Sequence, residues 1–360
     1  NGMDGGDDIV GGAGADKITG GNGDDSILPG AGDDTVDGGS NNDLVSYADR
    51  SGEDMTVDLR DGKTSGATGT AEKDALTSIE TGVGGSGNDT LYASPSANVI
   101  DGGSGDDTLN GSPVTDVLIG SAGNDTLLGN DGADMMYGSY GNDRMVGGEG
   151  GDIYEGGDGG GDIADFSAET SPIRVTLDGK ADDGKAGQAQ LDNVAASTDI
   201  VWGTAKDDAL AAGTTPAELR GNGGDDVLDG PGFLFGGAGD DLLRGSDQRD
   251  TLRGEAGKDE LYGGAEQDDL DGGSEDDYLE GGQGPDRMAG GDGFDEVDYA
   301  NRTNPIVVRL TDGARDGEGV TGSGSNVSAD CVGLFCDEVK PDNEKIVGGR
   351  VQDVVEVDEQ

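Results

Sequence analysis

The sequence predicts an all-β protein built as a parallel β-solenoid, in which the chain winds in stacked coils around a thin core. A nine-residue phrase, Gly-Gly-x-Gly-x-Asp-x-U-x with U a large apolar residue, recurs along most of the 360 residues. Repetition at a short fixed period is typical of stacked turns rather than of a globular core. Copies include residues 20–28, 102–110 and 236–244. Glycine is abundant as well, with 74 residues.

Each repeat divides into a turn and a short strand. The first six residues favour a turn because glycine tolerates positive φ, and positions seven to nine can form a strand. Two repeats should complete one coil of about 18 residues, with parallel strands on two faces, turns on two flanks, and a rise of about 4.8 Å. Position eight is apolar, as at Ile18, Leu109 and Leu127, and is predicted to point into the core.

Three runs of repeats alternate with three segments that lack the repeat. We predict repeats at residues 1–46, 84–164 and 203–298, the start of a further repeat at 348–360, and inserts at 47–83, 165–202 and 299–347. Each insert follows a similar run end and contains an alternating apolar segment, at 55–59, 173–177 and 306–310. This alternation predicts a strand in each insert, which we expect to be β-hairpin-like.

The charge of the chain requires a compensating cation. It has 77 acidic and 22 basic residues, no histidine, and a net charge of -55. Such a composition normally favours disorder, but a disordered acidic tail or a halophilic surface would not keep an apolar residue at position eight and carboxylates in the turns. The charge disfavours nucleic acid and anionic membranes, and no apolar run is long enough to insert into a membrane.

The turns point to calcium as that cation. They offer only carboxylate, carbonyl and hydroxyl oxygens, which hard divalent ions prefer. Calcium accepts six to eight oxygens in a flexible geometry, including the backbone carbonyls that glycine turns expose, whereas magnesium requires a tighter octahedron and retains its waters. We therefore expect many bound Ca²⁺ ions.

On these repeats the chain resembles the RTX, or haemolysin-type, calcium-binding repeat proteins of bacteria, over about three quarters of its length. The resemblance implies a parallel β-roll of calcium-binding nonapeptide repeats, interrupted here by the three inserts. It also implies that the position-six aspartate and turn carbonyls bind calcium between a turn and the next turn on the same flank. Carried over by position, the metal ligands are Asp7, Asp16, Asp25, Asp34, Asp43, Asp89, Asp107, Asp125, Asp134, Asp143, Asp152, Asp226, Asp241, Asp250, Asp259, Asp268, Asp277, Asp286 and Asp295.

Some turns depart from this pattern. Asn98 and Ala217 replace the aspartate, the turn at 156–162 carries an extra glycine, and the repeat at 230–235 is shortened, so we expect no standard site there. Asp116 ends a turn, GSPVTD, that lacks the glycines at positions two and four, and the turn of Asp208 matches the repeat pattern less well. In the second run one flank reads GGSGND, GGSGDD, GSAGND and GSYGND, while the other begins ASPSAN and GSPVTD. Calcium should therefore favour the first of these flanks over residues 84–119. The third run shows a milder form of the same asymmetry.

We predict that the chain is a non-catalytic, structural segment of a secreted or cell-surface bacterial protein, which binds calcium and folds as it does so. Extracellular calcium modules bind on the order of 10⁻⁴ to 10⁻³ M, which would leave the chain unfolded inside a cell. Cys331 and Cys336 lie close in one loop and cannot complete a zinc site without histidine, so a local disulfide is expected, in keeping with an extracellular location. The repeats reach both ends of the sequence, as expected for part of a longer protein.

Other function classes remain open. Catalysis within the segment is disfavoured because the aspartate pairs recur in most copies and no Ser-His triad can form. The chain could still be the carrier region of a secreted hydrolase. The inserts could bind a ligand, as in an adhesin, through Arg50, Arg174, Trp202 or Arg302. Alternatively, their aromatic residues Tyr47, Phe166, Trp202 and Tyr299 join adjacent rolls. Open solenoid ends could also pair, giving a filament or a surface assembly.

Overall fold

The computed structural model describes residues 1–60, 63–96, 98–185 and 191–298, and the backbone of four later strands, β34 (Val307–Leu310), β35 (Cys336–Val339), β36 (Asn343–Val347) and β37 (Val354–Val357). The described residues form strands and turns without a helix, and so contain no helix able to cross a membrane. The chain divides into two compact units. The first holds Asn1–Phe166 and Gly179–Asp199, and the second holds Ser167–Asp178 and Ile200–Gln360.

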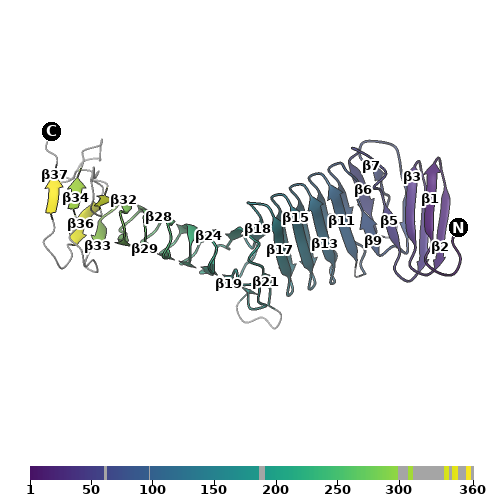
Figure 1. The fold of residues 1–360 in the computed structure, drawn as a ribbon. Coiled ribbons are helices and arrows are strands. Elements are labelled where there is room, and N and C mark those ends of the chain that lie inside the picture. Colours follow the sequence, from purple (N-terminus) through teal and green to yellow (C-terminus); the bar gives the residue numbers. More distant parts are fainter. Residues whose placement is uncertain are drawn as a thin grey trace. The chain divides into compact units, whose positions relative to one another are not determined.

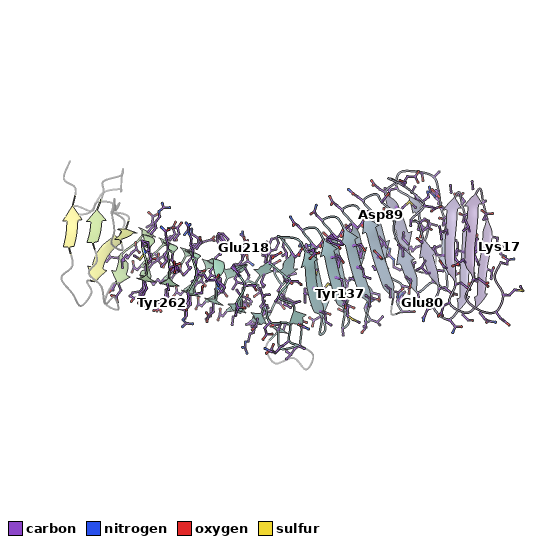
Figure 2. All side chains as sticks on the ribbon, in the orientation of Figure 1. Lys17, Glu80, Asp89, Tyr137, Glu218 and Tyr262 are labelled. Atoms are coloured by element: carbon purple, nitrogen blue, oxygen red, sulfur yellow. The ribbon has the colours of Figure 1, made fainter. Side chains whose placement is uncertain are left out.

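The first unit has a nine-stranded parallel sheet on one face (Figure 1). Successive strands in a run are one coil apart, as in the pairing of Val117 with Met135. The turns line the two flanks of each coil, and Glu80 and Asp89 lie on opposite flanks (Figure 2). In sheet order the strands are β1 (Asp8–Ala13), β3 (Ser26–Ala31), β5 (Leu44–Ser46), β9 (Thr81–Val83), β11 (Val99–Ser104), β13 (Val117–Ala122), β15 (Met135–Tyr140), β17 (Ile153–Asp158) and β21 (Asn193–Val194).

Two shorter sets of strands cover the opposite face of the first unit. Between the two faces, position eight forms the core: Leu109, Leu118 and Leu127 have no exposed surface. The predicted parallel solenoid, with two repeats in each coil, is confirmed. One set is β2 (Lys17–Asn22), β4 (Thr35–Ser40) and β8 (Ala75–Thr77), and the other is β7 (Gly66–Ala67), β6 (Met55–Asp58), β10 (Thr90–Tyr92), β12 (Thr108–Asn110), β14 (Thr126–Asp131), β16 (Arg144–Glu149) and β18 (Ile163–Asp165).

Insert 1, residues 47–83, adds strands to the sheets of both neighbouring runs. Its first strand, β6, pairs in parallel with β10 of the following run, whereas β8 and β9 pair in parallel with β4 and β5 of the preceding run. A short antiparallel pairing of β6 with β7 is its hairpin-like part. The nine-stranded sheet therefore continues through the insert from β5 to β9 to β11.

Insert 2 is divided in the same way, because Ser167–Asp178 belongs to the second unit and Gly179–Asp199 to the first. Its predicted strand at 173–177 is β19 (Ile173–Thr176), which pairs in parallel with β23 (Ala209–Ala211) of the second unit. Later in the insert, β21 pairs with β17 of the first unit, and β20 (Gly184–Lys185) precedes β21 in the chain.

The second unit repeats the two-faced coil. The shortened repeat at 230–235 is accommodated within it by one coil of 15 residues, seen in the bond from Asp226 N to Asp241 Oδ1. One face holds β22 (Ile200–Trp202), β24 (Ala217–Gly223), β26 (Gly232–Ala238), β28 (Thr251–Ala256), β30 (Asp269–Ser274) and β32 (Arg287–Asp292). The other holds β19, β23, β25 (Val227–Asp229), β27 (Leu242–Arg244), β29 (Glu260–Ala265), β31 (Tyr278–Gln283) and β33 (Asp295–Asp298).

Only strands of insert 3 are described. β33 pairs in parallel with β36, β32 with β35, and β34 with both β35 and β37. Of the predicted strand at 306–310, the described part is β34. The expected disulfide between Cys331 and Cys336, and the side chains of Tyr299 and Arg302, lie outside the residues whose side chains are described.

Candidate metal sites in the repeat turns

The backbone conformation of the turn explains why glycine recurs at two positions of the repeat. Positions two and four of a turn lie in the left-handed region, as at Gly21 (φ 128°) and Gly23 (φ 126°). This region costs other residues roughly 1–2 kcal/mol, so glycine is favoured. Several other residues at these positions keep the same backbone conformation, namely Asn41, Ser121, Asn130, Ser139, Asn222, Glu255, Glu266 and Glu275.

Glycine at position one has a different cause. A Cβ atom at Gly120 would collide with Asp125 Oδ2 in the same turn and would lie only 2.8 Å from the carbonyl oxygen of Gly138 in the next turn. A carboxylate oxygen and a backbone carbonyl oxygen therefore face the same small space above each such glycine. The turn thereby brings together two of the oxygen types that calcium binds.

One oxygen of most position-six aspartates is used in a ladder of hydrogen bonds. Asp107 N donates to Asp125 Oδ1, and Asp125 N donates to Asp143 Oδ1, both at 2.8 Å. The same bond recurs from coil to coil along both flanks, for example from Asp25 to Asp43 at 2.9 Å. The ladder fixes each carboxylate and leaves its second oxygen, Oδ2, to point into the turn.

In most turns this second oxygen has no partner in the protein. We call a turn open when Oδ2 of its position-six aspartate is buried without a hydrogen bond. Open turns end at Asp16, Asp25, Asp34, Asp43, Asp107, Asp125, Asp134, Asp143, Asp162, Asp226, Asp241, Asp259, Asp268 and Asp277. A buried charged oxygen without a partner is strongly unfavourable, so an open turn requires a cation or a proton.

The pKa values of these carboxyl groups reflect that requirement. Desolvation by burial is the main cause, with smaller contributions from neighbouring aspartates, and it raises the pKa of Asp107, Asp125 and Asp134 to about 7. For Asp226 burial raises the pKa to about 8. A divalent cation beside Oδ2 would reverse this penalty by stabilising the ionised form.

A second kind of turn satisfies the same oxygen with a protein group. Asp116 Oδ2 accepts hydrogen bonds from Ser112 N (2.6 Å) and Ser112 Oγ (2.8 Å). Asp250 is bound in the same way by Ser246, at 2.6 and 3.0 Å. In the turn of Asp208, Oδ2 accepts from Thr204 N at 2.6 Å. We call a turn closed when a protein group donates a hydrogen bond to this Oδ2 atom. In these three turns the donors belong to a hydroxyl residue at position two.

Further predicted ligands also lie in turns that differ from the open form. Asp7 Oδ2 accepts a hydrogen bond from Met3 N at 2.9 Å. Asp89 accepts Gly85 N at Oδ2 and Met55 N at Oδ1, the latter at 2.7 Å. In the turn of Asp152, the Tyr154 hydroxyl accepts a hydrogen bond from Gly147 N at 3.1 Å.

The last predicted ligands, Asp286 and Asp295, are buried members of the ladder. They accept the backbone N–H groups of Asp268 (3.1 Å) and Asp277 (3.0 Å). Sequence reasoning missed Asp162, which accepts Asp143 N at 2.9 Å despite the extra glycine in its turn. A signal was present, because Asp162 stands at a run end that resembles the one at Asp43.

Side chains of insert 1 continue the hydrogen-bond ladder beyond Asp34 on one flank. Asp74 Oδ1 accepts Asp34 N at 2.9 Å, and Asp74 Oδ2 accepts the buried Tyr47 hydroxyl at 2.9 Å. Beside it, Arg50 donates to both carboxylate oxygens of Glu72, at 2.6 and 2.7 Å, and to the carbonyl oxygen of Gly30 at 2.7 Å. Tyr47 and Arg50 therefore hold insert 1 against the first run.

Backbone carbonyls make up much of the oxygen set that the turns offer to a cation. No group of three or more acidic, histidine or cysteine side chains converges on a metal position in the described part of the chain. The open turns instead combine one carboxylate with carbonyl oxygens of successive turns. Such an oxygen set suits Ca²⁺, which tolerates neutral carbonyl ligands and irregular geometry.

The fold and its turns define a calcium-binding β-solenoid. The family model of the RTX calcium-binding nonapeptide repeat, which spans four copies, matches residues 1–36, 30–45, 83–118, 110–145, 128–163, 235–270 and 262–297. These segments cover more than half of the chain, so it belongs to the RTX calcium-binding repeat family, as predicted. A search of curated proteins found no match. Proteins with such repeats are typically structural and generally secreted by bacteria.

Proposed function

We propose that this chain is a calcium-triggered structural segment of a secreted or cell-surface protein, with Ca²⁺ bound in its open turns. Each ion would be held by the Oδ2 atom of a position-six aspartate and by carbonyl oxygens of that turn and the next one on the same flank. The segment would carry no catalytic group of its own, and its role outside the cell would be structural.

The buried Oδ2 atoms of the open turns carry this proposal. Asp107 N donates a hydrogen bond to Oδ1 of Asp125 at 2.8 Å, whereas Oδ2 of the same carboxylate has no hydrogen bond. An ion there would provide the missing partner and would add two positive charges against a net charge of -55. Binding and folding should therefore be coupled, because the binding oxygens converge only in the coiled chain.

The distribution of closed turns supports uneven calcium loading in the second run. On one flank, Asn98 and Asp116 lie in turns whose serines, Ser94 and Ser112, bond to them. On the other flank, the turn of Asp107 is open. The sequence led us to expect ions on the flank of Asp107, and the closed geometry of the turns of Asn98 and Asp116 supports that proposal. Asp89 differs from the expectation, because Gly85 N closes its turn.

A calcium titration of the purified chain, followed by far-UV circular dichroism, tests the function. We expect a cooperative coil-to-β transition that Ca²⁺ produces and that Mg²⁺ at the same concentration does not. The midpoint should be on the order of 10⁻⁴ to 10⁻³ M, the range of extracellular calcium modules. A chain that is fully folded in chelator, or folded equally by Mg²⁺, would contradict the proposal.

A further inference from the structure

The two described inserts continue the carboxylate ladder beyond the last repeat of a run. Asp43 is the last position-six aspartate of the first run, and Asp43 N donates to Glu80 Oε2 at 2.9 Å. This matches the bond from Asp25 N to Asp43 Oδ1 at 2.9 Å one coil earlier. The backbone continues as well: Thr81 N bonds Asp43 O at 2.9 Å, as Leu44 N bonds Asp25 O at 2.8 Å. Glu80, labelled in Figure 2, thus takes the place of a position-six aspartate.

Insert 1 also supplies the carbonyl oxygen that a following repeat would supply. A Cβ atom at Gly20 would collide with Asp25 Oδ2 and with the carbonyl oxygen of Gly38. One coil later, a Cβ atom at Gly38 would lie 2.6 Å from Asp43 Oδ2 and would collide with the carbonyl oxygen of Ser78. Ser78 holds this position at a φ of 51°, in the left-handed region.

Insert 2 reproduces the arrangement with different residues. Asp162 N donates to Asp199 Oδ2 at 3.1 Å, and Asp199 N donates back to the carbonyl oxygen of Asp162 at 3.0 Å. A Cβ atom at Gly156 would lie 2.7 Å from Asp162 Oδ2 and 2.6 Å from the carbonyl oxygen of Ser197. The hydroxyl oxygens of Ser197 and of the adjacent Thr198 are also buried without a hydrogen-bond partner, and hydroxyls are neutral oxygens of the type that calcium accepts.

The aspartates at these two positions are deeply buried and lack a partner on the inward oxygen. Asp43 has no exposed surface and Asp162 has 1 %. Oδ2 of each carboxylate has no hydrogen bond. On the other flank of insert 1, by contrast, Oδ2 of Asp74 accepts a hydrogen bond from the Tyr47 hydroxyl. The insert therefore completes one flank with a protein group and leaves the other with oxygens alone.

We propose that each of these inserts forms a hybrid calcium site with the last repeat of the run before it. The first site would use Asp43 Oδ2 and the Ser78 carbonyl, with Glu80 holding the Asp43 backbone. The second would use Asp162 Oδ2 and the Ser197 carbonyl, with Asp199 in the corresponding role. The inference rests on the proposed calcium function and extends it, because calcium would then fasten each insert to a run as well as fold the repeats.

Calcium anomalous scattering from crystals of the full chain grown with CaCl₂ tests the proposal directly. We expect peaks about 2.3–2.6 Å from both Asp43 Oδ2 and Ser78 O, and from both Asp162 Oδ2 and Ser197 O. Peaks at ordinary repeats such as Asp25, with none at Asp43 or Asp162, would overturn the hybrid sites and leave the proposed function intact. The absence of peaks at Asp25 as well would overturn both.

A matched pair of variants tests the first site in solution. Ser78→Pro cannot keep a positive φ and so displaces the carbonyl, whereas Ser78→Gly keeps both the φ and the carbonyl. By equilibrium dialysis at saturating calcium, Ser78→Pro should bind one ion fewer than the wild type, and Ser78→Gly the same number. Far-UV circular dichroism should show that both variants keep the repeat fold. An unchanged ion count in a folded Ser78→Pro variant would overturn the first site.

Discussion

Two aspartate-to-asparagine substitutions distinguish open from closed turns. In the open turn of Asp125, asparagine can keep the bond from Asp107 N to Oδ1 (2.8 Å) and loses only the charged Oδ2 that we assign to calcium. In the closed turn of Asp116, both oxygens are used, by Asn98 N (2.8 Å) and by Ser112. Asparagine there must leave one donor of this buried turn unpaired.

The two variants should respond differently to calcium concentration. Leaving a buried donor unpaired costs about 1–3 kcal/mol, so Asp116→Asn should lose that much stability at every calcium concentration. Near saturation, an ion that binds only the folded chain adds about 1.4 kcal/mol of stability for each tenfold rise in free calcium. The deficit of Asp125→Asn should therefore grow by about this amount per tenfold rise, because one ion is lost.

Urea unfolding followed by circular dichroism at a series of calcium concentrations measures both effects. Plotted against the logarithm of free calcium, the unfolding free energy of Asp116→Asn should run parallel to that of the wild type. The line for Asp125→Asn should be less steep. Equal slopes for Asp125→Asn and the wild type, or a reduced slope for Asp116→Asn, would refute the distinction between open and closed turns.

Three further predictions follow from burial and hydrogen bonding. Ionisation of buried carboxyls such as Asp107, whose pKa is raised to about 7 from 3.8, opposes the calcium-free fold. Without calcium, β-content by circular dichroism should therefore increase as the pH falls from about 8 to 4, and a decrease would contradict the burial. Tyr47→Phe leaves Asp74 Oδ2 without its partner and should cost about 1–3 kcal/mol in calcium-saturated urea unfolding, whereas a neutral result would argue against that bond. Leu127→Ala should cost about 2–5 kcal/mol in the same assay, with Leu128→Ala, whose side chain is only half-buried, as the milder control.

The repeat itself made much of the fold predictable. Position eight identifies core residues such as Leu127, and the period of two repeats per coil gives the pairing of Leu127 with Leu109 and Met145. These features depend only on local turn chemistry and on alternation along a strand. The sequence could not predict that the first strand of insert 1, β6, pairs with the following run while β8 pairs with the preceding run. Both strands are short, and nothing in their residues indicates which run each will join.

Which turns are open was harder to predict, because an aspartate at position six can lie in either kind of turn. Ser112 and Ser246 at position two mark closed turns and are visible in the sequence. Asp89 carries no such mark. Its turn reads GGSGND, yet it is closed, because its neighbour in the stack is insert backbone and a Cβ atom at Gly87 would collide with the Glu53 carbonyl oxygen. The neighbouring rung, rather than the turn's own residues, determines this geometry.

The strand pairing of insert 1 with the preceding run also affects the rate at which the chain can fold. Within a run, each new coil joins residues 18 apart, such as Asp107 and Asp125, whereas the bond from Asp34 to Asp74 closes 40 residues. Loop-closure entropy costs about 0.6 kcal/mol more for each doubling of length. Winding should therefore advance coil by coil within a run and slow at the insert. In a refolding time course, the separate runs should form first, and the joining of β4 with β8 should be among the last events.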